Sequence, residues 1–131
     1  MLASALETLE AAGIARARIQ VVRAPGTFEL PILARALAEQ PAVAAVLCFG
    51  LVLKGETEHD RYIAAACAEG LMRVALDAET PVLFGVLTCA TLAQAKRRAR
   101  RASAGGLDKG REVAEAALAV LASLAEIGAA R

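Results

Sequence analysis

The sequence predicts a single α/β domain in which a parallel sheet is covered by helices on both faces. Two segments, Val43–Gly50 and Val82–Leu87, are continuously apolar over the length of a strand, which is typical of parallel strands buried on both faces. Helical patterns alternate with these strands along the chain. Apolar residues make up 57% of the composition and aromatic residues 3%, which favours close-packed helices on a sheet. We therefore expect residues 1–131 to form one domain.

The first half of the chain predicts a helix, a strand and a second helix. Leucines at helical spacing predict a helix over Leu2–Ala12, and Gly13 can adopt the left-handed conformation that ends it. Ile19–Val22 is rich in β-branched residues and precedes the turn signal APG, so we expect a strand there. A helical apolar pattern resumes over Thr27–Gln40, where Pro31 is tolerated because it lies near the first turn.

The second half predicts helices after each of the two apolar strands. One helix is expected from Thr57 to about Glu79, with Asp60 three residues after Thr57 as a variant of the capping box. A basic helix is expected over Thr91–Ala102, followed by the loop SAGGLDKG and a final helix over Val113–Ile127. Parallel strands in this order require right-handed crossovers.

The predicted element order has one irregular feature, at its beginning. The first helix has no strand in front of it, and three strands make a small sheet for five helices. The arrangement therefore lacks an opening strand. We expect either that another segment, for example one from a neighbouring chain, lies between the strands that begin at Ile19 and Val43, or that the sequence is a truncated or engineered form.

Composition and charge exclude several classes of function. A net charge of +1 gives no overall attraction to nucleic acid or to anionic membranes. The longest uncharged run, Pro41–Leu53, is shorter than the roughly 20 apolar residues that cross a bilayer. The start of the chain is acidic and has no basic n-region, so we expect a cytoplasmic protein. The cysteines lie far apart without a CxxC pair, which predicts buried thiols and neither a disulfide nor a metal site: Cys48, Cys67 and Cys89.

Polar and ionisable residues follow the carboxyl ends of the predicted strands, where open α/β sheets bind ligands. The segments APGTFELP, GLVLKGETEH and TCATLAQAKRRA follow the three strands in turn. They are expected to bring five side chains to one edge of the sheet: Glu29, Lys54, Glu56, His59 and Arg98.

Four motifs, in the order APGTFELP, GLVLKGETEHD, PVLFGVLT and QAKRRA, resemble the 6,7-dimethyl-8-ribityllumazine synthase family, and DKGREVAEAAL resembles its closing segment. The resemblance covers nearly the whole chain. It implies a flavodoxin-like, three-layer α/β/α fold with a parallel sheet, whose first strand, with the aromatic ring that stacks on the pyrimidine, is missing from this sequence. It also implies a homo-oligomer, a pentamer or a 60-subunit shell, with sites shared between subunits.

The implied activity is a step of riboflavin biosynthesis that needs no cofactor or metal. It condenses 5-amino-6-ribitylamino-pyrimidinedione with 3,4-dihydroxy-2-butanone 4-phosphate and releases phosphate and water. By family position, His59 would transfer protons and Arg98 would bind the phosphate, together with the GET segment formed by Gly55, Glu56 and Thr57. An imidazole changes charge near neutrality, and a guanidinium binds phosphate in a bidentate manner, so both side chains suit these roles.

The resemblance assigns the second substrate to three further regions. Thr27, Phe28 and Glu29 match the segment that holds the ribityl chain, and Val52, Leu53 and Lys54 match the stretch whose backbone faces the pyrimidinedione. Phe84 would form a wall of the site, and Lys109 matches a lysine near the heterocycle.

Simpler interpretations of these residues remain open. His59 alone is compatible with a solvated helix cap, the arginines of KRRARR with a basic surface, and Phe84 with the core. A shell or flavin-type ligand-binding protein that has lost catalysis is the alternative on the same fold. An unrelated phosphate-binding α/β protein would be expected to carry a Gly-rich phosphate loop, which this sequence lacks.

Overall fold

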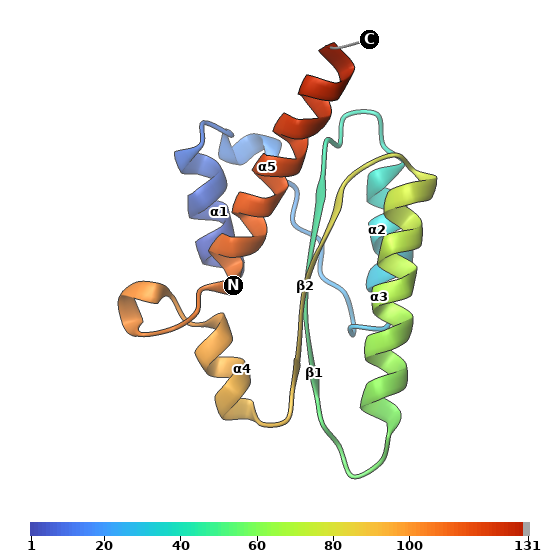
Figure 1. The fold of residues 1–131 in the computed structure, drawn as a ribbon, viewed down its shortest axis with the longest axis vertical. Coiled ribbons are helices and arrows are strands. Elements are labelled where there is room, and N and C mark those ends of the chain that lie inside the picture. The colour runs from blue at the N-terminus through green and yellow to red at the C-terminus, as the bar shows by residue number, and fades with distance from the viewer. Residues whose placement is uncertain (130–131) are drawn as a thin grey trace.

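The computed structural model describes residues 1–129 and forms three layers, with a two-stranded parallel sheet between helices (Figure 1). The expected α/β/α architecture is confirmed. The strands are β1 (Val46–Leu53) and β2 (Val82–Cys89). Helices α2 (Leu30–Ala38) and α3 (His59–Asp77) cover one face of the sheet. Helices α1 (Leu2–Ala11), α4 (Leu92–Ala99) and α5 (Lys109–Ala129) lie on the other side.

The two strands pair in parallel over their whole length, from Val46 opposite Val82 to Leu53 opposite Cys89. Both carboxyl ends therefore lie at the same edge of the sheet, which is the lower edge in Figure 1. Strand β1 continues three residues beyond the predicted end at Gly50, because Leu51–Leu53 still find partners on β2.

Side chains of β1 alternate between two cores on the two faces of the sheet. Cys48 and Val52 pack with α2 and α3 in the larger core, whose most buried members are Cys67 and Leu71. Leu47 and Phe49 pack on the opposite face. There the contact is made with α1 and α5 through Ala5, Leu9 and Ala114. The three cysteines are buried, as the sequence predicts, and their thiols are free.

Helix α5 begins at Lys109, four residues before the predicted start at Val113, because the buried Asp108 caps it. Asp108 accepts hydrogen bonds from the Ser4 hydroxyl (2.5 Å) and from the backbone N–H groups of Arg111 (3.3 Å) and Ala102 (3.5 Å). The bond from Ser4 is the main cause that lowers the pKa of this carboxyl below its ordinary value. Asp108 thereby joins the starts of α1 and α5 to the turn at Ala102–Ala104.

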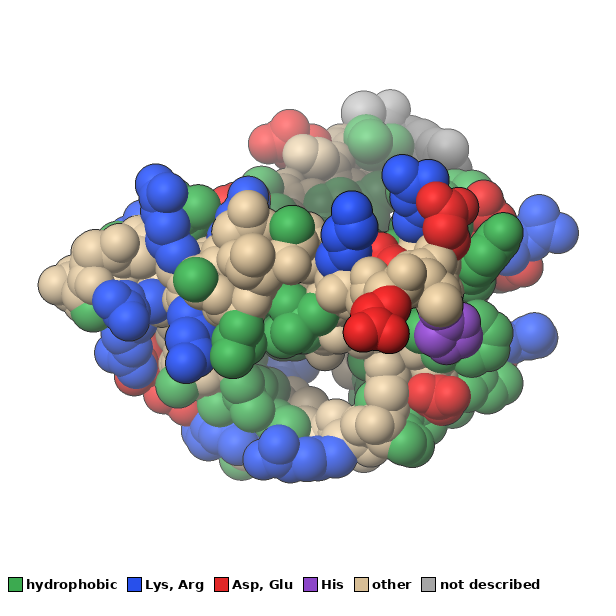
Figure 2. Space-filling model, turned by 90° about the horizontal axis from the view of Figure 1, so that it is seen from below, with side chains coloured by type: hydrophobic (Ala, Val, Ile, Leu, Met, Phe, Trp, Pro, Cys, Tyr) green, Lys and Arg blue, Asp and Glu red, His purple; other side chains and the backbone are tan. Residues whose placement is uncertain are grey.

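The predicted strand at Ile19–Val22 is wrong. These residues follow a short 3₁₀ turn (Arg16–Arg18) and run without sheet pairing, whereas a strand requires a neighbour for its backbone groups. An apolar groove of about 880 Å³ is lined by this segment on one side and by Ala44–Gly50 on the other. Its opening is visible as a gap in Figure 2. The expectation that another segment lies between them stays a prediction.

The edge of β1 along this groove carries backbone groups that β2 does not use. Val46 donates its N–H to Pro81 and Lys54 donates its N–H to Cys89, so the even-numbered residues of β1 face β2. The N–H and C=O groups of Leu47 and Phe49 consequently face the groove.

No helix within residues 1–129 is long and apolar enough to cross a membrane.

Candidate active site

The lower edge of the sheet carries the GETEH loop. Strand β1 ends at Leu53, the exposed residues 54–58 form the loop, and α3 begins at His59. Figure 2, viewed from below, shows the single histidine on this edge with acidic side chains beside it. The expectation that this motif lies where a strand passes into a helix is therefore confirmed.

His59 is the first residue of α3 and is exposed, so its imidazole is accessible to a ligand. Its backbone N–H donates to the Thr57 hydroxyl at 3.4 Å. Glu58 occupies the N-cap position without capping the helix through its side chain, and it pairs instead with Arg61 at 3.0 Å. The start of this 19-residue helix therefore points N–H groups and the positive end of the helix dipole toward the loop. This arrangement favours an anion beside His59.

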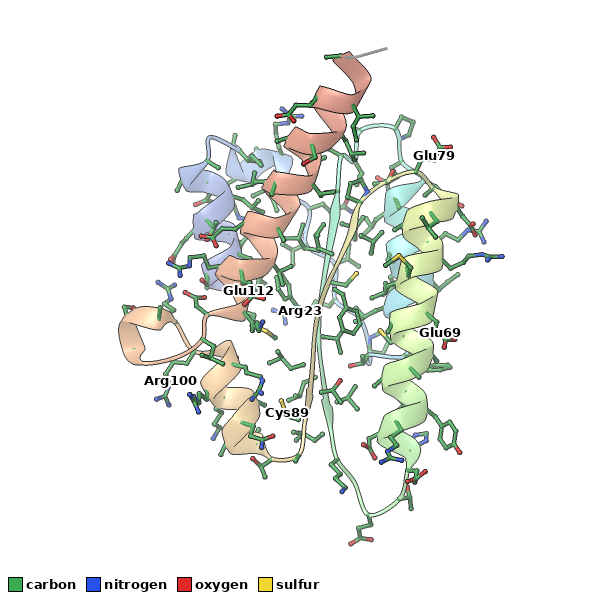
Figure 3. All side chains as sticks on the ribbon, viewed as in Figure 1. Arg23, Glu69, Glu79, Cys89, Arg100 and Glu112 are labelled. Atoms are coloured by element: carbon green, nitrogen blue, oxygen red, sulfur yellow. The ribbon has the colours of Figure 1, made fainter. Side chains whose placement is uncertain are left out.

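Arg98 lies in the last turn of α4, the helix that follows β2. The helix begins at the lower edge, where Thr91 accepts the N–H of Gln94 at 3.2 Å, and six residues of helix place Arg98 about 9 Å further along the axis. Arg98 is partly buried and makes no ion pair within the described part of the chain. By contrast, Arg101 pairs with Glu7 at 2.6 Å, and Arg100 points away from the sheet (Figure 3). Helix α4 itself contains Arg97 and Arg98, neither of which forms an ion pair within residues 1–129, and Arg98 is the more buried of the two.

The segment Thr27–Glu29 forms a turn before α2 and lies against β1. The Thr27 hydroxyl donates to the carbonyl of Leu51 at 3.3 Å, and the carbonyl of Thr27 accepts the N–H of Leu30 at 3.2 Å. Phe28 is 58% exposed, and Leu51, the partner of Thr27, lies two residues before the end of β1. The structure thus brings this segment close to the end of β1, as the sequence predicts.

The backbone groups at the end of β1 are divided between its two sides. Val52 has a buried side chain, and its backbone groups face β2 in the alternation set by Val46 and Lys54. Lys54 uses its N–H on Cys89. Of the predicted stretch Val52–Lys54, only Leu53 directs its backbone N–H and C=O to the side on which Thr27 lies. Leu51 shares this direction, and the sequence reasoning did not include it.

Phe84 and Lys109 lie away from this edge of the chain. Phe84 pairs with Cys48, four residues before the pair of Val52 with Thr88, so it is about 13 Å back along the strand. Lys109 is the first residue of α5, and its ammonium lies 2.5 and 2.7 Å from the carboxylate oxygens of Glu112. Within one chain the structure groups Thr27–Glu29, Val52–Thr57 and His59 near the carboxyl end of β1. It leaves Phe84, Lys109 and also Arg98, in the last turn of α4, away from that end.

The described residues contain no group of three or more His, Cys, Asp or Glu side chains that could hold a metal ion. Cys89 ends β2 and is buried against α4, with Ala95 as its neighbour in the core there (Figure 3). The groups that this site offers include an accessible imidazole, the guanidinium of Arg98 and the N–H groups at the start of a helix.

Residues 1–125 match the sequence profile of the 6,7-dimethyl-8-ribityllumazine synthase family. The chain belongs to this family. It is 44% identical over 129 residues to the 6,7-dimethyl-8-ribityllumazine synthase of Stenotrophomonas maltophilia (strain K279a), an alignment that covers 97% of this chain and 80% of that protein. It is 42% identical to the lumazine synthase of Salinibacter ruber (strain DSM 13855 / M31), over 90% of this chain and 74% of that protein. A 6,7-dimethyl-8-ribityllumazine synthase 1 from Caulobacter vibrioides (strain ATCC 19089 / CIP 103742 / CB 15) is also 42% identical, over 97% of this chain and 81% of that protein.

Proposed function

We propose that this chain is a lumazine synthase, a transferase that condenses 5-amino-6-ribitylamino-pyrimidinedione with 3,4-dihydroxy-2-butanone 4-phosphate in riboflavin biosynthesis. The observation that carries the proposal is the GETEH loop, which runs from the end of β1 into the start of α3 with His59 exposed on it, in a chain of this family. A cytoplasmic location, expected for an enzyme of riboflavin biosynthesis, is part of the proposal.

The reaction requires two bound substrates, a leaving phosphate and proton transfer. The 5-amino group of the pyrimidinedione forms an imine with the ketone of the phosphate substrate and releases one water, and phosphate is then eliminated. The ribitylamino nitrogen closes the ring on the remaining carbonyl with the release of a second water. His59 would take up and return protons, because its imidazole is exposed and an imidazole can act as both general acid and general base. Arg98 and the N–H groups of Gly55–Thr57 would hold the phosphate.

The pyrimidinedione substrate would bind between Thr27–Glu29 and the end of β1. The Glu29 carboxylate can accept hydrogen bonds from several ribityl hydroxyls, and the backbone of Leu53 can pair with the polar edge of the heterocycle. Both substrates would then meet at the lower edge of the sheet, which is the geometry that a condensation needs.

We further propose a homo-oligomer, a pentamer or a 60-subunit shell, in which neighbouring subunits share each site. Phe84 is 46% exposed although it lies on a strand, and it is distant from the site of its own chain, which supports a role at the site of a neighbour. Lys109 would reach a site by the same arrangement. Large apolar side chains are also exposed on α2, on α3 and in the turn before α2: Phe28, Ile32, Tyr62, Met72 and Leu76. Light scattering on the purified chain tests the mass of the assembly.

The direct test of activity mixes the purified chain with both substrates and follows lumazine formation by absorbance. Formation should exceed the rate without enzyme and should fall in His59→Ala and in Arg98→Ala. Arg100→Ala is the matched control at the C-cap of the same helix, because its side chain points away from the sheet, and it should retain the activity. A folded, assembled sample with no rate above background would contradict the proposal and favour a shell or ligand-binding role.

A further inference from the structure

The segment Thr27–Pro31 rests directly on two glycines from different elements, Gly50 of β1 and Gly70 of α3. A Cβ atom on Gly50 would lie 2.9 Å from the Thr27 hydroxyl oxygen and 3.2 Å from a methyl carbon of Leu30. A Cβ atom on Gly70 would lie 2.9 and 3.0 Å from two ring carbons of Pro31. We call Gly50 and Gly70 the glycine pair.

Neither glycine is needed for an unusual backbone conformation. The glycines with positive φ are Gly13 and Gly105, so the glycine pair has ordinary backbone angles. Glycine in a strand or in the middle of a helix is otherwise unfavourable, because it costs conformational entropy and offers no side chain to pack. The close approach of Thr27 and Pro31 is the physical reason for glycine at these two positions.

The contacts of the glycine pair leave the segment little freedom. The Pro31 ring is rigid and belongs to the first turn of α2, so it cannot turn aside as a long side chain would. Beside Gly50, the Thr27 hydroxyl is held by the carbonyl of Leu51 at 3.3 Å. The segment is thus fixed to β1 at one end and to α3 at the other.

This fixation sets the position of the two groups assigned to the pyrimidinedione substrate. Leu53 follows Gly50 by three residues on the same strand, and its backbone faces the side of Thr27. The Glu29 carboxylate turns back over Gly26, where a Cβ atom would meet its oxygen at 2.8 Å. The offset between the carboxylate and the end of the strand is therefore determined by how closely the turn lies on β1 and α3.

We propose that Gly50, Gly70 and the Thr27 hydroxyl are positioning residues that set the distance between Glu29 and Leu53, and thereby the recognition of the ribityl-bearing substrate. The inference rests on the proposed function. A ligand held at both ends requires both sites at a matched distance, and a displacement of about 1 Å can lower a rate by as much as a hundredfold. The start of α3 and Arg98 would hold the phosphate substrate. Its binding therefore does not depend on the distance between Glu29 and Leu53.

The experiment compares steady-state kinetics for the two substrates in Gly70→Ala, Gly50→Ala and Thr27→Val. We expect the KM for the pyrimidinedione to rise by about tenfold or more, while the KM for the butanone phosphate stays nearly unchanged. Thr27→Ser, which keeps the hydroxyl, should restore the wild-type KM. Thr27→Val leaves the glycine pair intact, so this variant still tests the proposal if Gly50→Ala and Gly70→Ala do not fold.

Gly128→Ala is the matched control for Gly70→Ala, because Gly128 also lies in a helix and a Cβ atom there meets nothing within 4 Å. It should leave both KM values unchanged. Equal changes of both KM values in the three variants, or wild-type values in all of them, would overturn the inference.

A second measurement separates the inference from the proposed function. Amide hydrogen exchange over residues 27–33 should accelerate in Gly70→Ala and in Gly50→Ala, and stay at the wild-type rate in Gly128→Ala. If the wild-type chain shows no turnover, the proposed function fails while accelerated exchange still supports the positioning role of the glycine pair. Unchanged exchange in both variants overturns that role whatever the activity.

Discussion

The Cys48 thiol should make the folded chain unstable in alkaline solution. Cys48 lies in the middle of β1, is 4% exposed and faces the core between the sheet and α3. Burial, with a smaller effect from the nearby Cys67, raises its pKa from 9.0 to about 12. Above pH 9 the unfolded chain loses this proton and the folded chain keeps it, so unfolding becomes more favourable as the pH rises.

The size of this effect follows from the two pKa values. The stability from the neutral thiol is fully present below pH 9 and should fall by about 1.4 kcal/mol for each pH unit above it. The fall should approach about 4 kcal/mol at pH 12, where the folded thiol also ionises. This is a large part of the 5–15 kcal/mol that typically stabilises a domain of this kind.

Urea unfolding at a fixed protein concentration and at several pH values from 7.5 to 10.5 measures the effect. Cys48→Ala removes this titrating group. The free energy of unfolding of wild type should therefore fall relative to that of the variant progressively above pH 9. Val86→Ala is the control, because Val86 belongs to the same core but does not ionise. The difference in the free energy of unfolding between wild type and Val86→Ala should be the same at every pH. Parallel curves for wild type and Cys48→Ala would refute the reasoning.

Two further predictions concern Asp108 and the groove. Asp108→Asn should lower the free energy of unfolding at pH 7 by about 1–3 kcal/mol, because it weakens the buried bonds from Ser4 and the start of α5. Folding lowers the pKa of this carboxyl, so the stability that the ionised carboxylate contributes is present above the ordinary value of 3.8 and is lost as the pH falls through the folded value. The difference in the free energy of unfolding between wild type and Asp108→Asn should therefore shrink as the solution is made acidic. A short peptide of alternating Val and Ala should bind along β1 and protect the amides of Leu47 and Phe49 from exchange. The same peptide with methylated backbone nitrogens is its control, and equal protection by both would contradict pairing with the strand.

Much of the fold could be predicted because the dominant signals are local. The apolar runs at Val43–Gly50 and Val82–Leu87 indicated buried parallel strands, and the structure places both in the sheet. The GETEH loop was placed correctly because a ligand edge follows from the direction of the strands. The helices were found with boundaries that differ by a few residues, since their ends depend on caps such as Asp108.

The errors share a physical cause, which is dependence on distant neighbours. Ile19–Val22 has the composition of a strand, yet its backbone has no strand to pair with in the structure. The position of Phe84 depends on distant neighbours in the same way, because the register sets it back along β2, so its predicted role at a site stays a prediction that needs a neighbouring subunit. A glycine within an apolar strand was a usable signal of close approach at Gly50, and it was not used.

The sequence by itself determined the α/β class, the family and the position of His59 at the start of a helix, because these follow from periodicity and motif order along the chain. Only the tertiary structure decided that Leu53 rather than Val52 directs its backbone groups toward Thr27. It also decided that Arg101 forms an ion pair within residues 1–129 while Arg98 does not, and that Pro31 packs directly on Gly70. These features depend on strand register and on the distance between packed elements. Neither quantity is encoded locally, because each arises from contacts between residues that are far apart in the chain.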